Sequence, residues 1–118
     1  MRRAFICAFK GILGAARRER NFRIMLGCFA VVLAAGLFWR LSGIEWSVVL
    51  ICCGGVLAFE LMNTALEAAV DLVTRERCEL AKKAKDAAAG ASFVFSMFSV
   101  AVGLIIFVPR ILKLLGQQ

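Results

Sequence analysis

Three long apolar runs, separated by short polar or charged stretches, dominate the chain. About 20 apolar residues in a helix cross the ~30 Å hydrocarbon core of a bilayer, so the pattern predicts transmembrane helices over residues 22–40, 44–71 and 87–108. The first run contains the uncharged stretch IMLGCFAVVLAAGLFW, which closes on an aromatic pair typical of a membrane interface. The third is rich in small residues that allow helices to approach closely. The pattern therefore predicts an all-α membrane protein.

The segment before these spans, residues 1–21, is amphipathic instead. On a helix its large apolar side chains fall in a stripe roughly 120° wide, with the basic residues outside it. The stripe consists of Phe5, Ile6, Phe9, Ile12, Leu13 and Ala16. We expect a helix lying on the membrane surface. Its role is either that of an anchor on anionic lipid or that of carrying Glu19 toward the polar end of the second span. The charged residues 72–86 are expected to form a loop.

Composition supports the membrane interpretation, and we expect a single domain. Of 118 residues, 62% are hydrophobic, more than a soluble domain of this size can bury. The net charge of +7 alone is compatible with binding nucleic acid or an anionic membrane face. Beside such hydrophobicity it favours the membrane, so no nucleic-acid partner is expected. The five cysteines form no C-x-x-C pair and the chain has no histidine, which argues against a zinc site. A cleaved signal peptide is not expected, because the first long apolar run begins only near Ile24.

The basic residues predict the orientation of the spans. Most of the 15 Lys and Arg residues lie before the first span or between the second and third; only Arg40, Arg110 and Lys113 fall on the other side. By the positive-inside rule, the N-terminus and the 72–86 segment face the cytoplasm.

A row of polar side chains interrupts the second span. It consists of Glu60, Asn63, Glu67 and Asp71, which point within about 80° of one another on a helix. By residue counting, Glu60 and Asn63 lie inside the cytoplasmic leaflet. An ionisable side chain there costs roughly 2.5 to 3.5 kcal/mol and is a functional candidate by default. The alternative is that the row only hydrogen-bonds to neighbouring helices.

The row suits a particular chemistry. Carboxylates at an interface hold Mg²⁺, which usually arrives with nucleotide phosphates, and a further carboxylate can accept a proton from an alcohol. Lys82, Lys83 and Lys85 could meet phosphate oxygens, although basic loops beside membranes commonly only set topology. The chain has neither a G-x-x-x-x-G-K-[ST] nor a G-x-G-x-x-G motif, so a nucleotide site would be of another kind.

Three segments together resemble the prokaryotic integral-membrane diacylglycerol kinase family. They are RERNFR from Arg18 to Arg23, ExxNTALExxVD from Glu60 to Asp71, and AKKAKDAAAGA from Ala81 to Ala91. The resemblance covers nearly the whole chain and is closer to the Gram-positive branch, whose members are typically undecaprenol kinases.

The resemblance implies a homotrimer in the bacterial cell membrane, with active sites between protomers at the cytoplasmic face. The enzyme would transfer the γ-phosphate of Mg-ATP to a lipid alcohol, either undecaprenol or, alternatively, diacylglycerol. By motif position, Glu60 would be the general base and would contact the lipid, and Glu19 and Glu67 would hold Mg²⁺ and with it the nucleotide. The other nucleotide contacts would be Asn63, Glu76, Arg77, Lys85 and Asp86, and the other lipid contacts Phe9 and Asn21.

Two other classes of function remain open on the residues alone. Small proton-coupled exporters are of similar length and also depend on a carboxylate in the membrane, but they usually have four spans. A noncatalytic assembly subunit is the third interpretation, and it would tolerate replacement of the three glutamates.

Overall fold

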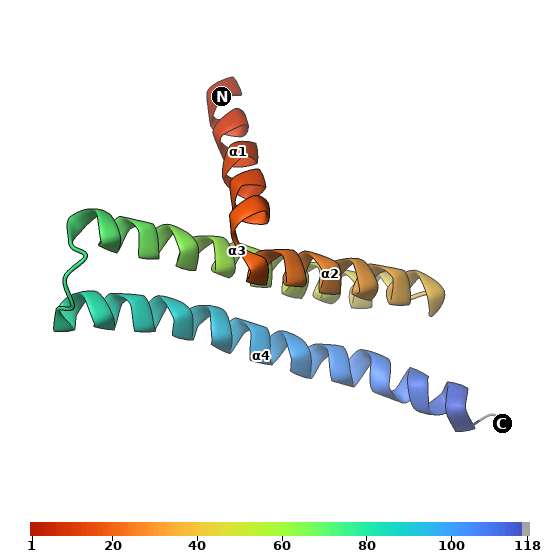
Figure 1. Cartoon of the computed structure of the whole chain (residues 1–118). Helices are drawn as coiled ribbons and strands as arrows, with labels where there is room; N and C mark the ends of the chain where they lie inside the picture. The colour runs from red at the N-terminus through yellow and green to blue at the C-terminus, as the bar shows by residue number, and fades with distance from the viewer. Residues whose placement is uncertain (117–118) are drawn as a thin grey trace.

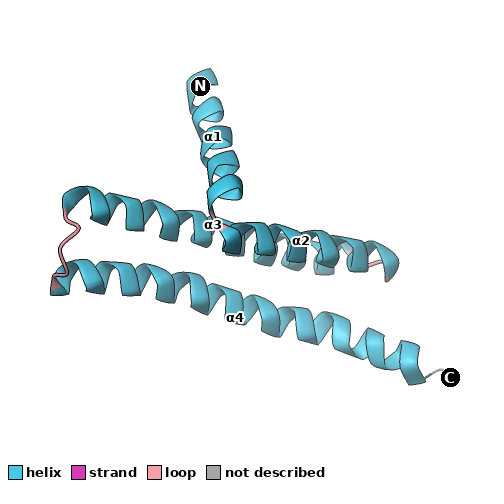
Figure 2. Ribbon diagram, in the orientation of Figure 1, coloured by secondary structure: helices cyan, strands magenta, loops and turns pink. Residues whose placement is uncertain are grey.

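The computed structural model describes residues 1–116, which form four helices joined by short connections (Figures 1 and 2). They are α1 (Arg2–Arg18), α2 (Arg20–Phe38), α3 (Gly43–Val73) and α4 (Glu79–Gly116). Helices α3 and α4 form a long antiparallel hairpin, α2 lies beside α3, and α1 departs steeply from the other three (Figure 1). The predicted all-α architecture, a first helix followed by three long apolar ones, is confirmed.

Helices α2, α3 and α4 are each long and apolar enough to cross a membrane, with 19, 31 and 38 residues. At 1.5 Å per residue, α2 is about 28 Å long, close to the thickness of the hydrocarbon core. By the same rise, α3 is about 46 Å and α4 about 57 Å long. The hairpin therefore extends well past the end of α2, and Figure 1 shows it running beyond the point where α2 begins.

The loop between α3 and α4 is shorter than predicted. It was expected over residues 72–86, but only residues 74–78 lie outside the helices. The segment after the turn is rich in alanine and lysine, which are strong helix formers. It also holds an i,i+4 ion pair, with Lys82 Nζ 2.6 Å from Asp86 Oδ2. Charge excludes this segment from the hydrocarbon, but it does not prevent a helix.

The third span also runs past its expected end at residue 108, through Pro109 to Gly116. Proline has no N–H, so the carbonyl of Ile105 loses its helical partner. The next carbonyl, that of Ile106, accepts a hydrogen bond of 2.7 Å from the Arg110 guanidinium. The helix continues past the proline despite the lost backbone hydrogen bond.

The boundary between the first two helices lies at Glu19, whose backbone is extended (φ −98°, ψ 112°), and not at residues 21–22. Its N–H donates to the Ala15 carbonyl at 2.8 Å. Across the joint, Arg23 Nη1 donates to the carbonyl of Arg17 at 2.9 Å, and Phe22 is only 1% exposed. Backbone and side-chain contacts on both sides thus hold the steep turn between α1 and α2.

At the opposite end of α2, the start of α3 carries a capping box. The Glu45 N–H donates to Ser42 Oγ, and the Ser42 N–H donates to Glu45 Oε1, both at 3.2 Å. The same carboxylate accepts from Arg110 of α4, with the closest N–O distance at 2.8 Å. This ion pair ties the first turn of α3 to the last part of α4.

The small buried core lies next to this capped end. Leu41, Val49 and Ile106 form it, and Trp46 is among the side chains packed around it. Many large apolar side chains elsewhere are exposed in the single chain. Lipid or further copies of the chain would cover such surfaces in a membrane.

Helices α3 and α4 approach closely at Gly55. A Cβ added at this residue would overlap the ring of Phe95, whose other neighbour is Phe59, stacked at a centroid distance of 5.1 Å. We expect Gly55→Ala to push the two helices apart and to destabilise the protein by about 1 to 3 kcal/mol, the usual cost of overpacking. Thermal unfolding in detergent micelles measures the loss.

The neighbouring Gly54→Ala is the matched control, because a Cβ there would meet nothing within 4 Å. It adds the same methyl group to the same helix. Equal melting temperatures for the two variants would contradict the close approach at Gly55.

Candidate functional site

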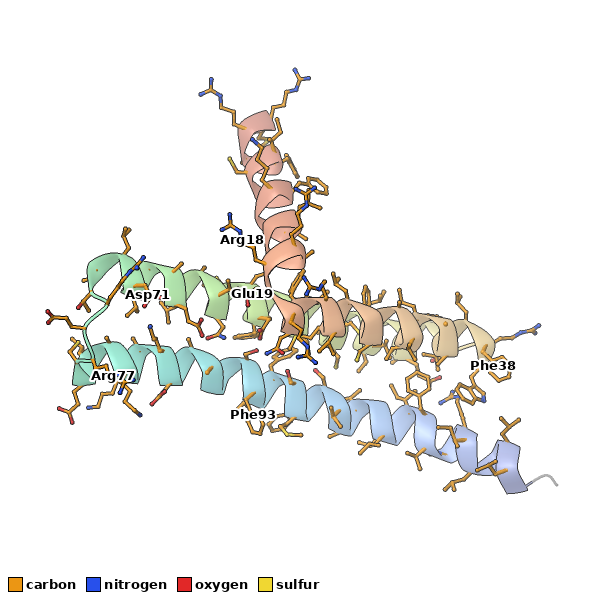
Figure 3. All side chains as sticks on the ribbon, viewed as in Figure 1. Arg18, Glu19, Phe38, Asp71, Arg77 and Phe93 are labelled. Atoms are coloured by element: carbon orange, nitrogen blue, oxygen red, sulfur yellow. The ribbon has the colours of Figure 1, made fainter. Side chains whose placement is uncertain are left out.

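The polar row on α3 spans the level at which α2 begins. Helix α2 has 19 residues, and the same number counted along α3 from Gly43 ends at Leu61, which therefore lies level with the start of α2. Because α2 and α3 are antiparallel neighbours, Glu60 lies near the level of Glu19 and the α1–α2 joint. The rest of the row continues beyond α2, and Figure 3 shows Asp71 near the far end of the hairpin, opposite to the end that carries Phe38.

Glu60 is buried against α4. Its side chain is 8% exposed, and its Oε2 accepts a hydrogen bond of 2.9 Å from the hydroxyl of Ser92, which is 6% exposed. Sequence reasoning missed Ser92. A signal existed, since Ser92 follows Lys85 by seven residues and so shares its face of α4.

That shared face meets the polar row at a second point. Lys85 Nζ is paired with Asp71 Oδ1, while Asp86 turns to Lys82 of its own helix. Both pairs are exposed, and exposed pairs contribute little to stability. The predicted nucleotide contacts Lys85 and Asp86 are therefore held by weak, exchangeable partners.

A cavity of about 550 Å³, lined mainly by charged residues, lies at the turn between α3 and α4. It is lined by Thr74, Arg75, Glu76, Arg77, Cys78, Glu79, Ala81, Lys82, Lys85 and Asp86. Four of the predicted nucleotide residues, namely Glu76, Arg77, Lys85 and Asp86, thus share one cavity. Arg75 is an additional lining residue that sequence reasoning did not single out. The lining carries four cations and three carboxylates, which favours an anionic ligand, and the volume is in the range of small-molecule sites.

Asn63 lies between Glu60 and this cavity, and its side-chain oxygen is buried. Within residues 1–116 that oxygen accepts no hydrogen bond. A buried acceptor without a donor costs about 1 to 3 kcal/mol. The unsatisfied oxygen therefore points to a donor from outside the single chain, such as water, substrate or a neighbouring protomer.

The two predicted magnesium ligands lie on different elements, Glu19 at the joint between α1 and α2 and Glu67 on α3. Glu19 is half-buried at the joint, and Glu67 is exposed, with no salt bridge to any described residue. Helix α1 does contact α3. In the part of the chain that the structure covers, no three His, Cys, Asp or Glu side chains gather closely enough to hold a metal ion. Mg²⁺ on a nucleotide usually needs only one or two carboxylates, because phosphates and water complete its shell, and each of these glutamates is a ligand of the type that such an ion takes.

The predicted lipid contacts outside α3 are both exposed. Phe9 is 71% exposed in the outward-facing stripe of α1, and Asn21 is exposed at the start of α2. Within residues 1–116 no side-chain hydrogen bond or ion pair joins either of them to Glu60.

An apolar groove of about 330 Å³ runs between α2, α3 and α4. It is lined by Met25, Cys28, Phe29, Val32, Val49, Cys52, Cys53, Val56, Leu57, Ser96, Ser99, Val100, Val102, Gly103 and Phe107. Its lining reaches Leu57 and Ser96, each about one helical turn from Glu60 or Ser92. The groove thus ends beside the buried carboxylate.

Comparison with known proteins connects these features to a family. The family model described as prokaryotic diacylglycerol kinase matches residues 6–107. The undecaprenol kinase of Bacillus subtilis (strain 168) is 45% identical over 109 residues, which cover 92% of this chain and 89% of that protein. A diacylglycerol kinase of Synechocystis is 38% identical over 95% of this chain and 65% of its own length. One from Pseudomonas aeruginosa is 37% identical over 71% of this chain and 68% of its own length. The chain thus belongs to the prokaryotic diacylglycerol kinase family and is a lipid kinase.

Proposed function

We propose that this lipid kinase transfers the γ-phosphate of ATP to undecaprenol and produces undecaprenyl phosphate, with Glu60 as the general base. The observation that carries the proposal is the placement of Glu60, a buried carboxylate between an apolar groove and a row of polar side chains. A relative named undecaprenol kinase, 45% identical over most of both chains, supports the choice of lipid. Diacylglycerol is the second candidate, because other relatives are named diacylglycerol kinases.

In this mechanism Glu60 acts on the lipid alcohol. One carboxylate oxygen, Oε2, is occupied by the hydrogen bond from α4, which leaves Oε1 for the substrate hydroxyl. Oε1 takes the proton as the alcohol oxygen forms its bond to the γ-phosphorus. The bond from that phosphorus to the bridging oxygen breaks, and ADP leaves with the electron pair. The lipid phosphate and ADP are the two products.

The nucleotide would occupy the polar side of Glu60. Asn63 offers its unpaired oxygen, Lys85 and Arg77 offer positive charge to the phosphates, and Glu76 and Asp86 line the same cavity. Glu19 and Glu67 would hold Mg²⁺. When bound, the ion neutralises charge on the phosphates and on the leaving group.

The lipid chain would lie in the apolar groove. The groove is bounded by three apolar helices and its lining ends one turn from Glu60. In this groove a polyisoprenoid chain would remain in apolar surroundings, while its terminal alcohol would reach the Glu60 carboxylate. The groove has room for only part of such a chain, and the rest would remain in the bilayer.

The active form would be a homotrimer with sites shared between protomers. The extensive apolar surface of the helices is suited to contact with further copies as well as with lipid.

The active site would face the cytoplasm in the bacterial cell membrane. The basic turn between α3 and α4 lies at the same end of the hairpin as the polar row (Figure 3), and the positive-inside rule places such a segment in the cytoplasm. ATP is available on that side.

Family membership favours the kinase over a proton-coupled exporter, and α2, α3 and α4 are the helices that fit a span, one fewer than such exporters usually have. A noncatalytic subunit would contain the same helices. Unlike the proposed kinase, a noncatalytic subunit would keep its function when Glu60 is replaced.

Turnover of the two lipid alcohols by the same preparation tests the proposed substrate. In mixed micelles with Mg-ATP, we expect kcat/KM for undecaprenol to exceed that for diacylglycerol at least about tenfold, or ~1.4 kcal/mol in transition-state stabilisation. Diacylglycerol kinase activity becomes the better assignment if the order is reversed. Absence of transfer to either alcohol would contradict the proposal as a whole.

A further inference from the structure

The side chain that occupies Oε2 of Glu60 is not among the site residues predicted from the sequence. Ser92 lies on α4, 32 positions from Glu60 in the sequence, and it is 6% exposed. Its hydroxyl donates to Glu60 Oε2 at 2.9 Å. This is the only side-chain hydrogen bond between two buried residues in the described part of the chain.

We propose that Ser92 is the positioning residue of this kinase: its hydroxyl orients the Glu60 carboxylate so that Oε1 faces the lipid alcohol. The inference rests on the proposed role of Glu60 as the base. Ser92 itself touches neither substrate, and it acts only through the carboxylate.

The need for such a donor follows from burial. An ionised carboxylate has no proton to donate and requires hydrogen-bond donors when it leaves water. Within residues 1–116, Ser92 supplies the only donor to Glu60. A hydrogen bond to a charged acceptor is among the stronger kinds, so it restricts the rotation of a side chain that otherwise has three rotatable bonds.

The surroundings of the pair limit how else Glu60 could turn. The next residue on α3 toward its N-terminus, Phe59, stacks on Phe95 of α4, which lies one turn from Ser92. The Phe95 ring also fills the space beside Gly55. These aromatic rings cover one side of the pair, and the apolar groove approaches it through Leu57 and Ser96. Between Asp86 and Ser92, α4 carries only alanines and Gly90, so no large side chain of that turn stands beside the carboxylate.

Threonine and valine at this position provide a matched test, because they have nearly the same shape and differ in one hydroxyl group. In the full-length protein in mixed micelles with undecaprenol and Mg-ATP, we expect Ser92→Thr to stay within about threefold of the wild-type kcat. Ser92→Val should lose about 10- to 100-fold, the range for loss of a hydrogen bond to a charged group. The KM for ATP should change little in either variant, since the nucleotide contacts lie elsewhere.

Ser92→Ala provides a second variant that removes the hydroxyl without adding volume, and it should show the same loss in kcat as Ser92→Val. A melting temperature measured for each variant separates misfolding from a catalytic defect. Wild-type kcat in folded Ser92→Ala would overturn the inference, as would equal losses in the threonine and valine variants.

The outcome for Glu60→Gln separates the two proposals. Full activity of that variant would remove Glu60 as the base, and the role of Ser92 with it. If Glu60→Gln is inactive while Ser92→Ala and Ser92→Val turn over like the wild type, the base assignment stands and only the positioning role fails.

Discussion

Glu60→Gln is expected to reduce kcat for lipid phosphorylation by about 100- to 10,000-fold, the contribution typical of a general base. Glutamine has the same shape as glutamate, and its amide oxygen can still accept the hydrogen bond that Glu60 accepts from Ser92. It cannot take the proton of the alcohol. The variant should therefore fold and bind Mg-ATP but transfer almost no phosphate. Transfer of labelled γ-phosphate to undecaprenol in mixed micelles measures this.

Glu45→Gln is the matched control for this experiment. It makes the same chemical change on the same helix, at the end of α3 away from the polar row, where Glu45 pairs with Arg110 and caps the helix. We expect a lower melting temperature and an unchanged kcat. Comparable kcat values for Glu60→Gln and wild type would show that another group accepts the proton, or that none is required.

The second large effect is expected at the magnesium ligands. Glu67→Gln and Glu19→Gln should each raise the KM for Mg-ATP about 10- to 100-fold, since each removes a charged ligand worth roughly 1.5 to 3 kcal/mol. Glu67 forms no ion pair with any described residue, so its charge has no structural partner within residues 1–116. Activity titrated against total Mg²⁺ at fixed ATP measures the requirement.

Excess Mg²⁺ should partly restore both of these variants, because a weakened site fills at higher ion concentration. It should not restore Glu60→Gln, whose defect lies in the proton transfer. A magnesium requirement identical to that of the wild type in both variants would reject the assignment of these glutamates as ligands.

The outline of the fold could be predicted because the membrane restricts it so strongly. A helix that crosses hydrocarbon must satisfy its backbone internally and be apolar over about 20 residues, and both conditions can be read from a sequence. The ends of the helices were predicted less well. Residues 79–86 were expected in a loop because they are charged, yet they are helical, since charge and helix propensity are independent properties.

Part of the candidate site was equally visible in the sequence. Glu60 stands out because a carboxylate inside an apolar run is costly. Glu76, Arg77, Lys85 and Asp86 were predicted through the family resemblance, and they line one cavity. Ser92 was not predicted, because a serine in a run of small residues is ordinary and nothing local links it to a residue 32 positions away.

The sequence by itself determined the three apolar helices, the amphipathic first helix and the row of polar side chains on α3, since each depends only on periodicity within one segment. Only the tertiary structure decided which side chains of α4 contact that row. The register of α3 against α4, with Phe95 fitted against Gly55, brings Ser92 to Glu60 and Lys85 to Asp71. That register comes from side-chain packing between distant segments, which no pattern along a single helix specifies.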